Sequence, residues 1–297
     1  MKNIFIILIT FMAINLSYGQ DYVFRVMLNK GNNSYGTGDN WEKLKTGTKL
    51  LGEHSLKLEA GSYVGLVHAS GGTLEVKEAG EYTITSLDQK FANAQSTLTQ
   101  KYANYIVSNI NEDGHNRLGV TGSATRGLEN VDVFLWPVSN YYGEEILIDW
   151  KEEPNAESYV LYVKDKFDDI IYTYEASHPP YKIDFSDEKL ANEVLVQIYI
   201  EVKGHESSLQ NGYGIKPLKS DLKSEIKSDY EELKSELGEE SSLSNLVLAA
   251  YFEEQNLLPN AVTHYLKAIE ISPDVEDYQI LYNDFLLRQN LVNDSQE

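Results

Sequence analysis

The segment from Ser242 to Pro273 constrains the fold of this chain more than any other stretch. Three small residues in it let two helices approach closely: Ala249, Ala261 and Ala268. Phe252 and Tyr265 are large enough to fill the space between such helices. Pro259 suits the first turn of the second helix, because the amide that proline lacks has no partner there. The segment therefore predicts two closely packed helices joined by a turn.

The order and spacing of these residues resemble one tetratricopeptide (TPR) repeat, a unit of about 34 residues. Asn245 stands where that family often carries an aromatic residue. The resemblance implies a docking scaffold, with partner contacts expected at four residues on or near the two helices: Asn245, Tyr251, Asn256 and His264. Because a lone repeat cannot bury its own apolar face, the helical patterns on either side are expected to cap it. Residues 217–291 should thus form an all-α, TPR-like domain.

The N-terminus indicates export. Lys2 precedes an apolar run from Ile4 to Ile14, and Ser17–Gly19 supplies small residues at the positions that determine cleavage. We expect residues 1–19 to be a signal peptide. An uncleaved anchor is the alternative, but about eleven apolar residues fall short of the ~20 that span a bilayer. The mature protein is expected in the periplasm, or at the cell surface or outside the cell, without stable membrane insertion.

Composition limits the partners. The formal net charge is −21, and an acidic surface repels the phosphates of nucleic acids and anionic lipids. The absence of cysteine excludes disulfides and cysteine zinc sites. With 42% hydrophobic residues the chain can build packed cores, so disorder is a poor interpretation. Protein partners from the envelope or the secreted fraction fit these observations, although an acidic coat that only maintains solubility fits the charge as well.

Residues 20–127 are expected to form a small β roll or sandwich with a closing helix. Four short alternating runs predict strands: Tyr22–Leu28, His54–Leu58, Tyr63–Val67 and Thr73–Val76. Glycines between them suit tight turns. Three motifs resemble the periplasmic β domain of FecR-like proteins: Trp41-x-x-Leu44-x-x-Gly47-x-x-Leu50, Leu56-x-Leu58-x-x-Gly61-x-Tyr63 and Gly72-x-Leu74-x-Val76. That family also has a membrane helix and a cytoplasmic segment; their counterparts are not found here, so no transcription-regulatory role is expected.

Apolar residues recur at helical spacing between Phe91 and Ile110, which predicts the helix that closes this domain. A glycine-rich stretch from Asp113 to Gly127 marks the boundary to the next domain. Asn109, Asn111 and Asp113 have the spacing of a calcium loop, but Val120 stands where the closing glutamate belongs. We therefore predict no metal site.

Residues 128–206 are expected to form a second β domain. The longest alternation of the chain runs from Val194 to Val202, and shorter ones lie around Ile146–Trp150 and Tyr159–Val163. Six or seven strands with Trp150 early and Tyr159 in the next strand resemble a fibronectin type III or immunoglobulin-like sandwich. A polar linker, Ser207–Gly214, should follow.

The sequence shows no catalytic constellation and no cofactor fingerprint. No two of the six histidines have the helical spacing of a zinc pair, and neither Ser70 nor Ser123 lies in a Gly-x-Ser-x-Gly motif. We therefore predict a non-catalytic cell-envelope scaffold or adaptor that binds proteins through the TPR-like unit. The alternative is a carbohydrate- or peptidoglycan-binding module that uses its β domains, with Tyr141–Tyr142 or Tyr172 and Tyr174 as stacking platforms. A third class, a hydrolase with dispersed residues, requires a deep pocket with converging carboxylates or histidines.

Overall fold

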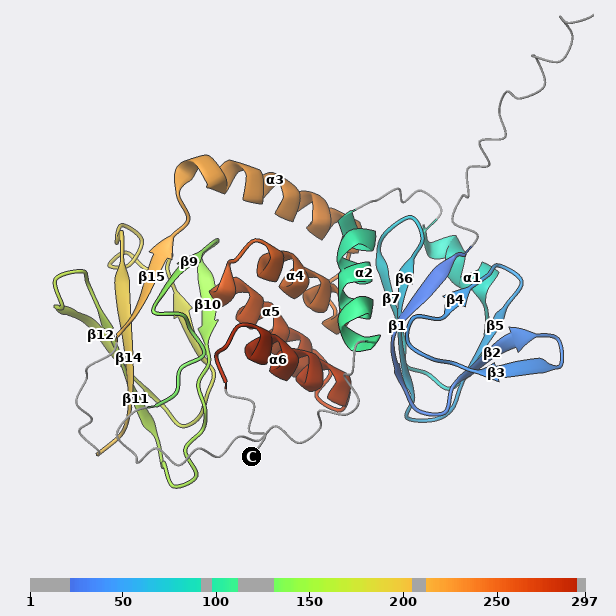
Figure 1. The fold of residues 1–297 in the computed structure, drawn as a ribbon, viewed down its shortest axis with the longest axis horizontal. Helices are drawn as coiled ribbons and strands as arrows, with labels where there is room; N and C mark the ends of the chain where they lie inside the picture. The colour runs from blue at the N-terminus through green and yellow to red at the C-terminus, as the bar shows by residue number, and fades with distance from the viewer. Residues whose placement is uncertain (1–21, 92–97, 112–130, 205–211, 293–297) are drawn as a thin grey trace, which may run out of the picture.

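A computed structural model of the chain describes residues 22–91, 98–111, 131–204 and 212–292. Several antiparallel sheets occupy its N-terminal part, and four helices follow between residues 220 and 288. Figure 1 shows the helices in the middle of the molecule, with one β domain on either side. The predicted multidomain order, β first and α last, is confirmed at this level. The expected signal peptide (1–19) and glycine-rich boundary (113–127) lie outside the described residues.

The first β domain consists of two four-stranded sheets packed face to face. One sheet has the order β4 (Lys49–Leu50), β1 (Phe24–Lys30), β6 (Tyr63–His68), β7 (Thr73–Val76). The other has the order β3 (Asn40–Lys43), β2 (Ser34–Thr37), β5 (Ser55–Leu58), β8 (Gly80–Thr83), and the short helices α1 (Ile84–Asp88) and η1 (Gln89–Phe91) follow it. Apolar side chains from both sheets form the core between them, including those of Phe24, Leu50, Leu56 and Leu66.

The first sheet carries buried side chains on both of its faces, and β6 is buried throughout. Because successive side chains of a strand point to opposite faces, Val64 and Leu66 lie inside this domain while Tyr63 and Val67 lie on its outer face. Tyr63 and Val67 belong to a second core, which they share with Met27, Leu28 and the helices. The outer face of this sheet is therefore a wall of the helical unit.

The second β domain holds the remaining strands: β9 (Val138–Tyr141), β10 (Glu145–Ile148), β11 (Tyr159–Lys164), β12 (Ile170–Ala176), β13 (Tyr181–Asp184), β14 (Val196–Val202) and β15 (Tyr213–Pro217). Five of them form a sheet in the order β12-β11-β14-β15-β9, and β10 pairs with β13. All pairs are antiparallel except β15 with β9. β15 extends this domain past the expected boundary at residue 206 and includes Gly214 of the expected linker.

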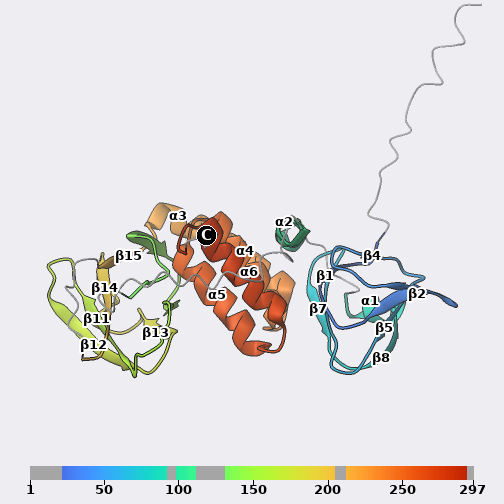
Figure 2. The same ribbon diagram turned by 60° about the horizontal axis from the view of Figure 1, so that its bottom comes forward.

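The helices are α2 (Leu98–Asn111), α3 (Ser220–Leu237), α4 (Ser242–Glu254), α5 (Leu258–Ile271) and α6 (Glu276–Arg288). α2 lies between the first sheet and α4 in both views, so the helix expected to close the first domain also packs into the helical unit (Figures 1 and 2). α3 runs from the end of β15 towards α2 (Figure 1). In the parts of the chain that the structure describes, no helix is long and apolar enough to cross a membrane.

α4 and α5 form the helical hairpin that the sequence predicts. Ser241 caps α4, with its side chain accepting from the Ser244 amide while the Ser244 side chain accepts from the Ser241 amide. Every residue of α4 from Ser242 to Glu253 is buried. Three alanines at the contact are fully buried: Ala249, Ala261 and Ala268. Close approach of two helices through small residues is thus the geometry of this hairpin.

We expect Ala261→Leu to lower the free energy of unfolding by about 1–3 kcal/mol, because the added carbons must displace side chains in a filled core. Ala79→Leu is the control: Ala79 is exposed, so the change should stay within about 0.5 kcal/mol. Urea denaturation followed by intrinsic fluorescence measures both. Equal stability of the two variants would contradict close packing of α4 on α5.

Candidate functional site

The structure buries three of the four residues predicted to contact a partner. Asn245 and Tyr251 are each 1% exposed and His264 is 9% exposed, whereas Asn256 is exposed. Asn256 follows α4 with a φ of 56°, a left-handed conformation that asparagine tolerates at the end of a helix. Of the four, only Asn256 is available to a partner without rearrangement.

His264 and Asn245 join α5 to α4. His264 Nδ1 lies 2.8 Å from Asn245 Oδ1, and its ring stacks on Phe252 with a centroid distance of 5.3 Å. Burial, together with Lys267 and Lys234, lowers the pKa of His264 to about 3, so the imidazole is neutral at physiological pH. The Asn245 amide also donates to the Ser241 carbonyl at 3.0 Å. These two polar side chains satisfy each other inside the hairpin.

Tyr251 lies between α4, α2 and α3. Its hydroxyl donates to the Ile226 carbonyl at 3.1 Å, and its ring meets Tyr102 edge-on at 5.5 Å. Burial raises the pKa of Tyr251, which therefore remains a neutral donor. The residue holds three helices together.

The second β domain covers α5 through backbone hydrogen bonds. Asn260 accepts from the Tyr142 amide at 2.8 Å and donates to the Tyr142 carbonyl at 2.6 Å. Thr263 Oγ1 accepts from the Leu147 amide at 2.8 Å. Two side chains of α5 thus satisfy main-chain groups of β10 and of the turn before it, which fixes the domain on the helix.

Asp149 ties the same domain to α6. The Tyr282 hydroxyl donates to Asp149 Oδ2 at 2.6 Å, and the Trp150 amide donates to Oδ1 at 3.0 Å. Burial raises the pKa of Asp149 to about 6, and the two hydrogen bonds oppose that rise. This carboxyl is the described acidic group whose ionisation is most strongly opposed by its surroundings.

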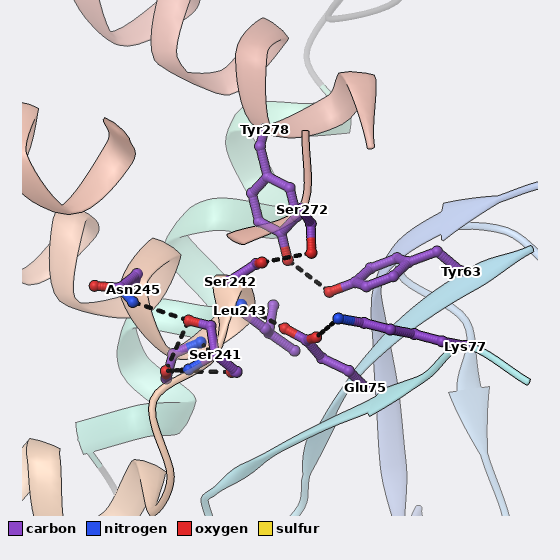
Figure 3. Close-up of polar contacts among 10 residues, drawn as sticks. Tyr63, Glu75, Lys77, Ser241, Ser242, Leu243, Asn245, Ser272 and Tyr278 are labelled. Carbon is purple, nitrogen blue, oxygen red and sulfur yellow. Dashed lines mark hydrogen bonds and ion pairs between the residues drawn. The ribbon is translucent and has the colours of Figure 1, made fainter. Parts of the chain in front are cut away.

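On the opposite side, the first β domain meets the helices through a buried polar junction (Figure 3). The hydroxyls of Tyr63 and Tyr278 lie 2.6 Å apart. Glu75 Oε1 accepts from the Leu243 amide at 2.8 Å, and Lys77 forms an ion pair with the other oxygen of Glu75 at 2.8 Å. A carboxylate at the N-terminus of α4 suits the partial positive charge there.

Burial is the main cause that raises the pKa of both tyrosines in this junction, and Tyr278 and Glu75 add to the effect on Tyr63. Both phenols therefore stay protonated, and one hydroxyl donates to the other. Ser242 and Ser272 continue the junction, with their hydroxyl oxygens 2.6 Å apart. The arrangement is suited to hold two domains in one position, because every polar group in it has a partner.

A cleft of about 850 Å³ opens beside this junction. We call it the β7 cleft, because Thr73, Leu74 and Glu75 of β7 form one of its walls. η1 forms a second wall, and residues 236–241, which comprise the end of α3 and the loop to α4, form the third. A second cleft of about 350 Å³ lies between β9, the end of β15 and the start of α3.

The structure also brings together Ser70, His68 and Asp88. His68 Nδ1 lies 2.6 Å from Ser70 Oγ and accepts from the Ser70 amide at 3.1 Å, and Nε2 lies 2.8 Å from Asp88 Oδ1. This geometry assigns the ring proton to Nε2. Hydrolase triads use the opposite nitrogens, and neither cleft is lined by any of the three residues. We interpret the cluster as a structural tie between the β6–β7 turn and α1.

The tyrosines considered as sugar platforms pack on other aromatic rings. Tyr141 stacks on Phe185 with centroids 4.1 Å apart, and Tyr142 meets Tyr230 of α3 at 5.5 Å. Tyr172 and Tyr174 stack with centroids 5.3 Å apart, Tyr174 packs on Tyr181 at 5.1 Å, and Lys189 lies over Tyr172 at 4.8 Å. Among the described residues, no group of three or more histidine, aspartate or glutamate side chains is placed to hold a metal ion. The prediction that no metal is bound stays a prediction.

Sequence reasoning missed the residues that hold the domains together. Glu75, Tyr63 and Asp149 look like ordinary strand and loop residues in the sequence, and no spacing pairs them with residues of the helices. The contact between Ser70 and His68 could have been predicted, because only one residue separates them in the sequence. The contact of His68 with Asp88 could not, because no local pattern joins these two residues. Asn260 and Thr263 share one face of α5, which could have indicated a polar contact surface.

No protein-family model matches the chain, and no curated protein matches it either.

The Tyr63–Tyr278 contact should show coupling in a double-mutant cycle. We expect Tyr63→Phe and Tyr278→Phe to couple by about 0.5–1.5 kcal/mol, the net contribution of one hydrogen bond. Urea unfolding of the two single variants and the double variant measures the coupling. Tyr63→Phe combined with Tyr199→Phe is the control and should be additive, because these residues belong to different β domains. Additivity of the Tyr63 and Tyr278 changes would mean that the junction does not form.

Asp149 should make stability depend on pH. The native state holds the proton of the Asp149 carboxyl more tightly than the unfolded chain does. The stabilisation that results is fully present only below about pH 4 and is lost as pH rises through about 6. Asp149→Asn removes this titration, so its stability relative to the unsubstituted protein should rise by about 2 kcal/mol between about pH 4 and about pH 7. Denaturation at both pH values measures it. A difference in stability between Asp149→Asn and the unsubstituted protein that does not change with pH would refute the prediction.

Proposed function

We propose that this protein is a non-catalytic scaffold of the cell envelope that presents two β domains at fixed positions on a helical unit to partner proteins. The observation that carries the proposal is the continuous core, in which Met27, Leu28, Tyr63 and Val67 of the first sheet pack with five helices. The bonds of Asn260 and Thr263 to the second domain support it from the other side. A rigid three-part body is what a scaffold requires, because relative domain motion is otherwise the default.

We also propose the finer identity of the three parts. The two packed four-stranded sheets support a FecR-like β domain, and Trp150 packed edge-on against Tyr159 supports a fibronectin type III-like or immunoglobulin-like domain. The alanine contact between α4 and α5 supports a TPR-like hairpin. The periplasm is the proposed location, supported by the apolar run and small residues of the N-terminus.

The helical unit leaves a smaller surface open to partners than the sequence predicted. Its central hairpin is covered by the chain itself, with α2 and α3 on α4 and the second β domain on α5. Docking is therefore proposed at the exposed turn between α4 and α5, where Asn256 lies, and at surfaces that the helices position on the β domains. For the glycan-binding alternative, the mutual packing of the candidate tyrosines gives no specific support.

We expect a photo-cross-linking amino acid at Asn256 to produce discrete, heavier adducts with one or a few envelope proteins in the native host. The same substitution at Asn290 is a matched control, because both asparagines are exposed and follow a helix with a φ of 56°. Electrophoresis and mass spectrometry of the full-length chain measure the adducts. The absence of any protein adduct at Asn256, or identical adduct patterns at both positions, would count against docking through the helical unit.

A further inference from the structure

β7 combines an open strand edge with a cleft. It is the last strand of the first sheet and pairs with β6 on one side. On its other side no strand pairs with it among the residues that the structure describes. The β7 cleft lies along the strand, since Thr73, Leu74 and Glu75 all line it. An unpaired edge offers main-chain donors and acceptors to an added strand.

The register of β6 and β7 shows which main-chain groups of β7 point away from β6. The His68 amide donates to the Gly72 carbonyl at 3.1 Å, and Val67 is opposite Thr73 in the next step of the ladder. In an antiparallel pair, residues that bond the neighbouring strand alternate with residues whose N–H and C=O point away from it. The outward main-chain groups of β7 are thus those of Thr73 and Glu75.

The walls of the cleft are acidic. Four glutamates line it (Glu75, Glu236, Glu239 and Glu240), against one lysine, Lys90. Glu239 is exposed. Of the other three, Glu75 forms an ion pair with Lys77, and Glu236 and Glu240 accept hydrogen bonds from Thr99 and Asn245. Leu74, Phe91 and Leu237 supply apolar surface between the charges. A ligand that fits must therefore bring positive charge, some apolar side chains and a backbone able to pair with a strand.

We propose that the β7 cleft binds an extended peptide segment of a partner protein, in which basic and apolar residues alternate, by adding it as a strand to β7. This inference rests on the proposed scaffold function and names the chemistry of one partner. Main-chain bonds to Thr73 and Glu75 provide the affinity, and alternate side chains meet the glutamates or the apolar wall, as in other cases of strand addition. The cleft volume of about 850 Å³ lies within the range of binding clefts.

The test uses the full mature chain and a fluorescent peptide of alternating lysine and valine, with binding followed by anisotropy at low salt. One control peptide has glutamate in place of lysine, and another carries N-methyl groups on alternate amides, which removes strand pairing and keeps the charge. Glu239→Lys is compared with Glu232→Lys, the same change at an exposed position of α3 outside the cleft.

We expect the lysine–valine peptide to bind the unsubstituted protein. Its binding to the Glu239→Lys variant should be about tenfold weaker, which corresponds to about 1.4 kcal/mol. Its binding to the Glu232→Lys variant should be unchanged. The N-methylated and glutamate peptides should not bind. Equal binding of the N-methylated peptide would overturn strand addition, and equal weakening by the two substitutions would overturn the location. A concentration-dependent dimer that Glu239→Lys abolishes would assign the edge to a second copy and overturn the peptide proposal. None of these failures affects cross-linking at Asn256, so the proposed function is tested separately.

Discussion

The burial of α4 from Ser242 to Glu253 is the constraint on which the rest of this structure depends. No residue from Ser242 to Glu253 reaches solvent appreciably, so the helix needs cover on every side. The chain provides that cover from distant segments, with α5 on one side, α2 and α3 on others, and the first sheet at its N-terminus. The burial of α4 therefore requires segments that are far apart in the sequence to pack together.

Buried polar contacts make this cover specific. An apolar surface alone tolerates several arrangements, whereas a buried donor or acceptor left without a partner costs about 1–3 kcal/mol. Glu75 meets the N-terminus of α4, Asn260 meets the backbone of the second domain, and Arg288 of α6 donates to the carboxylate of Glu253 at 3.0 and 3.1 Å. Each contact is satisfied in one register, so the two β domains hold one position relative to the helices.

Local patterns in the sequence predicted the elements, while the assembly depended on contacts that no local pattern contains. The alternation from Val194 to Val202 corresponds to β14, and the segment from Ser242 to Pro273 corresponds to the hairpin of α4 and α5. β2 was missed because it is short and contains Gly36, and β15 because it follows a polar stretch. Asn245 and His264 were expected at a partner surface, since polar side chains on a helix usually face water. The hydrogen bond between them inside the hairpin contradicts that expectation. This bond can be predicted only when the relative placement of both helices is known.

Because the chain covers its own helical hairpin, any further recognition must use surfaces that the fold leaves open. An open strand edge is hazardous for a soluble protein, since a second copy can pair with it. Around β7 the chain places glutamates, and with a formal net charge of −21 each copy repels another at this edge. The same charges attract a basic strand. Charge thus discriminates between a second copy of the chain and a basic strand. Main-chain hydrogen bonds alone cannot do so, because they carry no sequence information.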